Sequence, residues 1–355
     1  MTSNSISRGI VFLVGATIFS PITSAQANPA PQITLETCIS TKALTADSQM
    51  TLAELKALCE SLISVQTLSE SQIVESEHTG IQDTSGVLQT RIISEALNRT
   101  SRFMLTPHYR NFLMPAVYHK RPNEETYINA GEDMQNLRRT EAEIQLSVKI
   151  LMRENIFNDN GHLYFAYTNY SLWQVYSEKD SAPFRGTDHT PEAFISFYND
   201  WNLFGFRNTL NSIGISHQSN GQGGLLSRSW NRVFAQSIFE KDNLVLAFTP
   251  YYRIPESKKK NIEDKNGDDN PDLMDYLGHL NMSASYKFNN KILMLSTRNI
   301  FENTDKATFD LSFSFPITTN IRGVARYFNG YGYSLIDYNV KQETIGVGIL
   351  FTDIF

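Results

Sequence analysis

Residues 343–355 read ETIGVGILFTDIF, and this stretch decides the fold class. The apolar positions share one parity: Ile345, Val347, Ile349, Phe351 and Phe355. Successive side chains of a β-strand point to opposite faces, so residues of one parity lie on one face. The stretch therefore predicts a β-strand with an apolar face that runs to the end of the sequence.

The same period of two recurs upstream. Apolar and polar residues alternate at 141–150, 282–288 and 309–315. This alternation fits a membrane β-barrel, in which lipid covers one face of each strand and the lumen the other. It also fits the half-buried strands of a soluble sandwich, so periodicity alone leaves both architectures open.

The first 27 residues predict a secretory signal peptide. Arg8 precedes an apolar stretch from Gly9 to Phe19, and Ala25-Gln26-Ala27 provides an A-x-A cleavage site. The apolar stretch is too short to span a bilayer, and an ordinary buried helix is the alternative. No later segment has about 18 uninterrupted apolar residues. We therefore expect an exported chain that is either soluble or a barrel.

The end of the sequence and its aromatic content favour the barrel. A last strand that ends in an aromatic residue is similar to the signal by which outer-membrane proteins are recognised for assembly. Aromatic residues make up 12% of the chain, and barrels carry aromatic girdles at both membrane interfaces. We expect an all-β fold, a twelve-stranded antiparallel transmembrane β-barrel over 106–355, in the bacterial outer membrane. The expected strands lie near 109–118, 139–151, 162–177, 193–204, 207–219, 229–239, 243–254, 276–288, 291–301, 307–316, 320–330 and 343–355.

Residues 28–105 predict a partly helical extension in the periplasm. Apolar residues at helical spacing lie between Thr51 and Ser64, and the following stretch is polar. Cys38 and Cys59 both fall here, and a disulfide between them is expected in an exported protein, with two free thiols as the alternative. The net charge of −6 argues against nucleic acid as a partner, because phosphate backbones need a basic surface.

His217 and Ser219 continue the lipid-facing parity of Ile213 and Ile215. Polar side chains that face lipid are costly and usually mark function. The alternative is that the strand has already left the membrane there. A hairpin after 217–221 would place Asn231 beside His217.

These segments resemble the outer-membrane phospholipase A family. The matching stretch at 217–231 reads HQSNGQGGLLSRSWN, and 268–272 (DDNPD) and 329–338 (NGYGYSLIDY) match further family segments. The resemblance covers roughly 106–355. It implies calcium-dependent hydrolysis of the sn-1 and sn-2 acyl esters of glycerophospholipids and of lysophospholipids, activated by dimerisation.

The resemblance also implies the roles of the site residues. Ser219 would be the nucleophile, which needs an adjacent base. His217 would be that base and later the acid that protonates the leaving alcohol. Asn231 would orient the imidazole, as an aspartate does in other triads. The backbone N–H of Gly221 would stabilise the oxyanion.

A calcium site is implied beside this triad, because the family binds Ca²⁺ through oxygen ligands. The implied ligands are the carbonyl of Gln222, the hydroxyl of Ser227, a group of Ser181 from a second subunit, and Asp269 through water. Gly224 stands where the family often has Asp, so a weaker calcium affinity is expected. The stretch 264–268 has the residue types of an EF-hand start but the wrong glycine spacing and no closing Glu, so we expect a solvated loop.

A shared calcium site implies a homodimer as the active form. Asn169 continues the lipid-facing parity of Leu163, Phe165 and Tyr167, and it matches a family position that bonds across the dimer interface. The alternative is that Asn169 lies near the membrane boundary.

Two other classes of function make different predictions. A non-enzymatic pore or scaffold predicts no special polar residues on the lipid face, which His217, Ser219 and Asn231 contradict. A soluble α/β-hydrolase lipase needs a G-x-S-x-G elbow, and the sequence has none.

Overall fold

The computed structural model describes residues 56, 87–88, 91–92, 95, 105–131, 137–158, 160–178, 183–261, 264 and 267–353. The chain divides into two compact units, 1–83 and 84–355, and almost all described residues belong to the second. The predicted signal peptide (1–27), both cysteines and Ser181 lie outside the described residues. The predicted domain boundaries, including the extension at 28–105, stay predictions.

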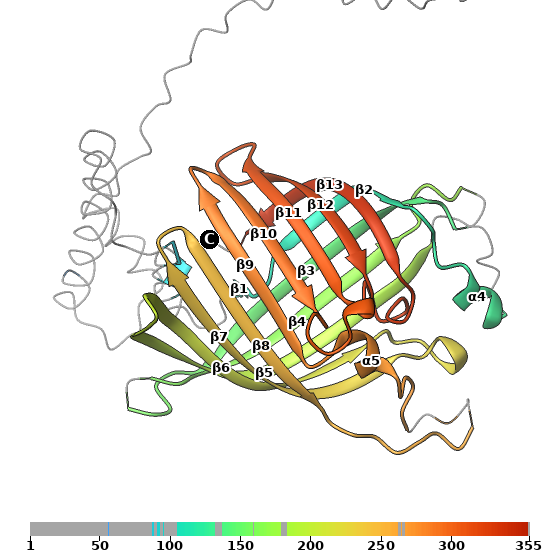
Figure 1. Ribbon diagram of the computed structural model, residues 1–355, viewed down its shortest axis with the longest axis horizontal. Helices are drawn as coiled ribbons and strands as arrows, with labels where there is room; N and C mark the ends of the chain where they lie inside the picture. The colour runs from blue at the N-terminus through green and yellow to red at the C-terminus, as the bar shows by residue number, and fades with distance from the viewer. Residues whose placement is uncertain are drawn as a thin grey trace, which may run out of the picture. The chain divides into compact units, whose positions relative to one another are not determined.

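Twelve strands form one closed antiparallel barrel, as predicted (Figure 1). The strands are β2 (Asn111–His119), β3 (Thr140–Arg153), β4 (His162–Trp173), β5 (Phe184–Leu203), β6 (Phe206–Ser219), β7 (Ser229–Lys241), β8 (Leu244–Arg253), β9 (Leu280–Phe288), β10 (Lys291–Arg298), β11 (Thr308–Pro316), β12 (Arg322–Gly330) and β13 (Gln342–Thr352). Each strand pairs with the next, and β13 pairs with β2 to close the barrel. The short β1 (Thr106–Pro107) pairs with β3 beyond the end of β2, so β1 and β2 form one interrupted strand.

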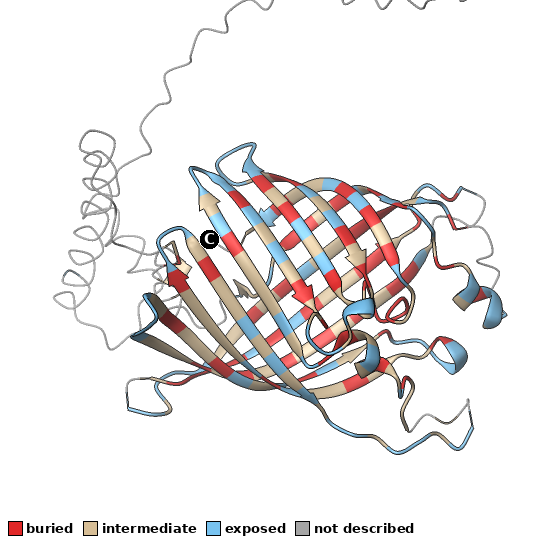
Figure 2. Cartoon of the chain, in the orientation of Figure 1, coloured by how far each residue is buried: buried red, intermediate tan, exposed pale blue. Residues whose placement is uncertain are grey.

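The barrel is polar inside and apolar outside. Glu141 and Glu143 on β3 are 0% exposed, whereas Leu146 on the other face is 54% exposed. Buried and exposed residues alternate in this way along the strands (Figure 2). A soluble sandwich would bury its apolar face, so this polarity selects the lipid-solvated barrel.

The two ends of the barrel differ in loop length. The turns at 204–205, 242–243 and 289–290 are short, and Phe204 and Gly205 both have positive φ, as a tight hairpin turn requires. Longer loops lie at the other end and include α4 (Glu125–Asn129), η1 (Gly224–Leu226), α5 (Leu273–Leu277) and η2 (Thr304–Lys306). Short turns face the periplasm and long loops the exterior in such barrels. Among the described residues, no helix has the length and apolar character needed to cross a bilayer.

Three expected strand limits differ from the structure by four residues or more. β4 ends at Trp173 rather than near residue 177. β5 begins at Phe184 rather than near residue 193, because its polar first half pairs with β4 although its sequence lacks apolar alternation. β9 begins at Leu280 rather than near residue 276, because Leu273–Leu277 form α5.

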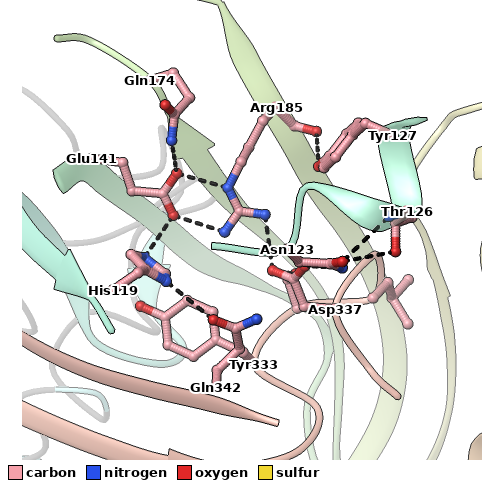
Figure 3. A network of polar contacts seen from close by, with 12 residues as sticks. His119, Asn123, Thr126, Tyr127, Glu141, Gln174, Arg185, Tyr333, Asp337 and Gln342 are labelled. Atoms are coloured by element: carbon pink, nitrogen blue, oxygen red, sulfur yellow. Dashed lines mark hydrogen bonds and ion pairs between the residues drawn. The ribbon is translucent and has the colours of Figure 1, made fainter. Parts of the chain in front are cut away.

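A buried ionic network joins β3 and β5 at the loop end of the barrel (Figure 3). Arg185 donates to both carboxylate oxygens of Glu141, at 2.7 and 2.8 Å, and to Asp337 at 2.8 Å. Gln174 at the end of β4 also donates to Glu141, at 2.7 Å. Gln174 follows the end of β4 and Arg185 lies at the start of β5, so Glu141 joins these two strand ends.

Part of the predicted extension contacts the barrel. The backbone N–H of Leu88 donates to Glu240 at 3.3 Å, and Lys149 lies 2.9 Å from Glu95. Arg91 donates to the carbonyl of His108 at 3.0 Å. These contacts attach the described residues between 87 and 95 to the strand ends at the short-turn side.

Candidate active site

His217 and Ser219 lie on the lipid-facing wall of β6, and Asn231 lies opposite His217 on β7. The Nδ1 atom of His217 is 2.9 Å from Oδ1 of Asn231. An amide oxygen only accepts, so Nδ1 carries the proton and Nε2 is left as an acceptor. Ser219 follows on the same face of β6, two residues beyond His217.

The inward-facing residues behind this pair hold the two strands together. Gln218 and Trp230 are register partners, and the indole N–H of Trp230 donates to Gln218 at 3.0 Å. Both side chains line a lumen cavity of about 570 Å³. The lumen therefore lies on the opposite side of the wall from His217, Ser219 and Asn231, and it is not their site.

Asn220 closes the loop between β6 and β7. Its side chain donates to the carbonyl of Leu226 at 2.7 Å and accepts from the N–H groups of Gln222 (3.3 Å) and Arg228 (3.0 Å). Gly221 has φ +65°, a conformation that favours glycine. This loop therefore presents Gly221 and Gln222 directly after Ser219 in a fixed conformation.

Ser227, Ser229 and Asp269 form a cluster of oxygen atoms beside the loop. Both hydroxyls donate to Oδ2 of Asp269, at 2.9 and 3.0 Å. The ammonium group of Lys259 contacts Oδ1 of the same carboxylate. A cationic group thus lies against hard oxygen donors of the type that calcium prefers, so these residues fit a calcium ion.

Asn270 fixes Asp269 against the barrel. The side-chain oxygen of Asn270 accepts from the N–H of Ser229 at 3.2 Å, and its carbonyl accepts from Arg253 at 2.9 Å. Nearby, Tyr338 donates to Asp272. Burial, together with this hydrogen bond, raises the pKa of Tyr338 above its ordinary value.

Of the predicted calcium ligands, Ser227 and Asp269 are hydrogen-bonded to each other. Gln222 lies in the loop that the Asn220 side chain holds through its hydrogen bonds. Ser181 lies outside the described residues. Gly224 has φ +59°, and a Cβ there would meet nothing within 4 Å. An aspartate at this position would reach open space but would require a strained backbone.

Asn169 lies on the lipid-facing parity of β4, where it was predicted. Its Oδ1 accepts from Ser171 at 3.0 Å, and its Nδ2 is 3.5 Å from Nδ1 of His189. The Asn169 amide therefore lies on the outer wall, where it can form further hydrogen bonds.

Two residues near the site were not predicted from the sequence. His189 on β5 is the register partner of Ser219, and its Nδ1 is 2.6 Å from the hydroxyl of Tyr167. Glu256 accepts a hydrogen bond from Nδ2 of Asn231 at 3.0 Å. Glu256 continues the parity of Tyr252 and Ile254, and this was the available signal for it.

A second group of possible metal ligands comprises His119, Glu141 and Glu143, whose ligand atoms lie within 4.8 Å of one another. Glu141 is already paired with Arg185, and Glu143 is 3.1 Å from Arg326. The arginine charges neutralise both carboxylates. This group is therefore part of the ionic network rather than a metal site.

Comparison with known proteins identifies the family. The family model for phospholipase A1 matches residues 88–351. The chain belongs to the phospholipase A1 family. Phospholipase A1 of Klebsiella pneumoniae is 31% identical over 282 residues, which cover 79% of this chain and 94% of that protein.

Solved structures of the family have the same barrel. Outer membrane phospholipase A from Escherichia coli is 31% identical, with a TM-score of 0.65 over 72% of this chain and 94% of that one. The Salmonella typhi outer membrane phospholipase, a dimer with bound calcium, is 30% identical, with a TM-score of 0.66 over 73% and 97%. A further E. coli structure carries an active-site change from asparagine to alanine. The chain is thus an outer-membrane barrel of this family.

Proposed function

We propose that the chain hydrolyses acyl esters of phospholipids, with Ser219, His217 and Asn231 as its catalytic residues. The observation that carries the proposal is the 2.9 Å hydrogen bond between His217 and Asn231 on a lipid-facing wall, beside Ser219. A polar pair at this position is costly unless it acts on lipid. The active-site asparagine of the E. coli protein supports the role of Asn231.

The reaction starts with proton transfer from the Ser219 hydroxyl to Nε2 of His217. The serine oxygen attacks the ester carbonyl, and the tetrahedral intermediate collapses to an acyl-serine as His217 protonates the leaving alcohol. Water, deprotonated by His217, then releases the fatty acid. Throughout, Asn231 accepts from Nδ1–H and holds the imidazole in the required tautomer.

The developing oxyanion is stabilised by the backbone N–H of Gly221. The hydrogen bonds of Asn220 hold the loop that presents this N–H close to Ser219. Bound calcium would supply positive charge and ordered water near that oxyanion. Ser227, Asp269 and the carbonyl of Gln222 would hold the ion, with Ser181 of the partner subunit completing the site. Without calcium, Lys259 keeps the Asp269 carboxylate paired.

Dimerisation follows from the shared site. The calcium-bound dimer of the S. typhi protein supports a homodimer here. Asn169 would bond to the partner barrel, where a polar contact is favoured because lipid offers none. Sedimentation in detergent with calcium measures the fraction of dimer. Asn169→Ala should contain more monomer than the control variant Thr249→Ala, whose substitution lies on β8. Unchanged sedimentation would remove Asn169 from the interface.

The function is tested by fatty-acid release from mixed micelles of phosphatidylcholine or lysophosphatidylcholine, with and without calcium. Hydrolysis should require calcium and vanish in Ser219→Ala. Ser237→Ala, on the same parity of the outer wall but distant along β7, should retain it. sn-2-labelled substrate tests release at the second position. Equal activity of Ser219→Ala and Ser237→Ala would contradict the assignment of the nucleophile.

A further inference from the structure

Two neighbouring strands and the segment after β8 contribute one chain of hydrogen bonds on the outer wall. His217 from β6 contacts Asn231 from β7 at 2.9 Å, and Asn231 contacts Glu256 at 3.0 Å. Glu256 follows the end of β8. Within the described residues, Asn231 is its one hydrogen-bond partner.

The segment that carries Glu256 is bound to the same residue through the backbone. The N–H of Ile254 donates to the carbonyl of Asn231 at 2.8 Å, which extends the pairing of β7 and β8 beyond Arg253. Glu256 has the parity of Ile254 and is its next neighbour on that face. A long side chain reaches diagonally across a strand pair, so this register places the carboxylate at Asn231.

A glutamate here determines which way the Asn231 amide points. The oxygen and nitrogen of an amide exchange places on a 180° flip, and only their partners distinguish the two states. An ionised carboxylate only accepts, so it selects the state in which Nδ2 faces Glu256. Oδ1 then faces His217 and can accept from Nδ1–H. The flipped amide would offer an N–H to Nδ1 and would favour the wrong tautomer for catalysis.

The carboxylate also supplies the negative charge that a neutral asparagine lacks. His217 becomes an imidazolium when it takes the proton from Ser219. An aspartate would stabilise that cation directly. Here the charge acts from one residue further away, through a polarised amide, because hydrogen bonds in series strengthen one another.

We infer that Glu256 is a positioning residue that orients and polarises Asn231 for His217. The inference rests on the proposed function. The role of Glu256 is to orient Asn231, and no proton transfer to Glu256 is part of the inference.

The test compares Glu256→Ala, Glu256→Gln and the control Glu125→Gln, which removes the same charge from an exposed glutamate in α4. Glu256→Ala should lower kcat on the order of tenfold to a hundredfold, the usual range for groups that orient a functional ligand. KM for micellar phospholipid and calcium affinity by isothermal titration should not change. Glu256→Gln should fall between Glu256→Ala and wild type, because Gln still accepts from Asn231.

A paired substitution separates positioning from packing. Asn231→Asp alone places two carboxylates side by side and should be almost inactive. Adding Glu256→Gln removes this repulsion, because the glutamine amide donates a hydrogen bond to the carboxylate at position 231. Activity of the paired variant should therefore recover at least tenfold over the single variant.

Each result bears on a distinct claim. No recovery in the paired variant, or wild-type kcat in Glu256→Ala, would overturn the inference while Ser219→Ala remained inactive. A Glu256→Ala variant that loses calcium affinity instead of kcat would also overturn it. Hydrolysis by Ser219→Ala would refute the nucleophile, and absence of hydrolysis by the wild-type protein would show that the proposed function itself fails.

Discussion

Removal of the Lys259 ammonium group should tighten calcium binding. Lys259 lies against Oδ1 of Asp269, and the two side chains are only 16% and 8% exposed. In the proposed calcium site, the ion competes with this ammonium for the carboxylate. Lys259→Met keeps most of the side-chain volume and removes the competing charge.

The magnitude follows from the geometry of the pair. Exposed ion pairs contribute about 0.2–1 kcal/mol, and hydrogen bonds to charged groups about 1.5–3 kcal/mol. The Lys259–Asp269 pair lies between these cases because it is largely but not fully shielded. A net value of about 1–2 kcal/mol corresponds to a roughly fivefold to thirtyfold lower Kd for calcium.

Calcium titration of the refolded protein by isothermal titration calorimetry measures this change. Lys260→Met is the matched control, because Lys260 is exposed and carries the same charge on the same loop. Its Kd should stay within about twofold of wild type, as expected for a screened surface charge. Equal Kd values for the two variants would refute the reasoning. Loss of hydrolysis by Lys259→Met at saturating calcium would show that Lys259 takes part in the reaction, rather than only competing with calcium for Asp269.

Three further predictions concern the barrel and its loop. Glu141→Ala should lower the free energy of unfolding in urea by about 3–5 kcal/mol, because it leaves the buried Arg185 without its main partner; a loss below about 1 kcal/mol would contradict this. Leu311→Arg near the middle of β11 should cost about 2–4 kcal/mol if that face contacts lipid, while Phe301→Arg in an exposed loop should be nearly neutral; refolding into vesicles measures both. Asn220→Ala should leave the barrel folded, as judged by circular dichroism, but weaken calcium binding, because the loop loses hydrogen bonds of about 1 kcal/mol each.

The barrel was predictable because each strand carries its own signal. Alternation of apolar and polar residues identifies a strand locally. The structure then distinguishes a lipid-facing wall from a soluble core, because apolar Leu146 is exposed whereas Glu143 on the other face is buried. The first half of β5 was missed because its polar sequence is held by pairing with β4, a contact distant in sequence.

The site was predictable only where the hairpin itself determines it. His217 and Asn231 lie on consecutive strands joined by one loop, so their register follows from the local sequence of that hairpin. Lys259 and Glu256 follow the last residue of β8. The parity of Tyr252 and Ile254 extends to Glu256, but nothing in the local sequence pairs Glu256 with Asn231 or Lys259 with Asp269, and these contacts depend on how the loop packs.

Covalent labelling tests the central claim most directly. A long-chain sulfonyl fluoride added to the refolded protein with calcium should modify one residue, and peptide mass spectrometry should locate the adduct on Ser219. His217→Ala should abolish labelling, because the serine loses its base. An adduct on another residue, or undiminished labelling of Ser219 in His217→Ala, would contradict the account.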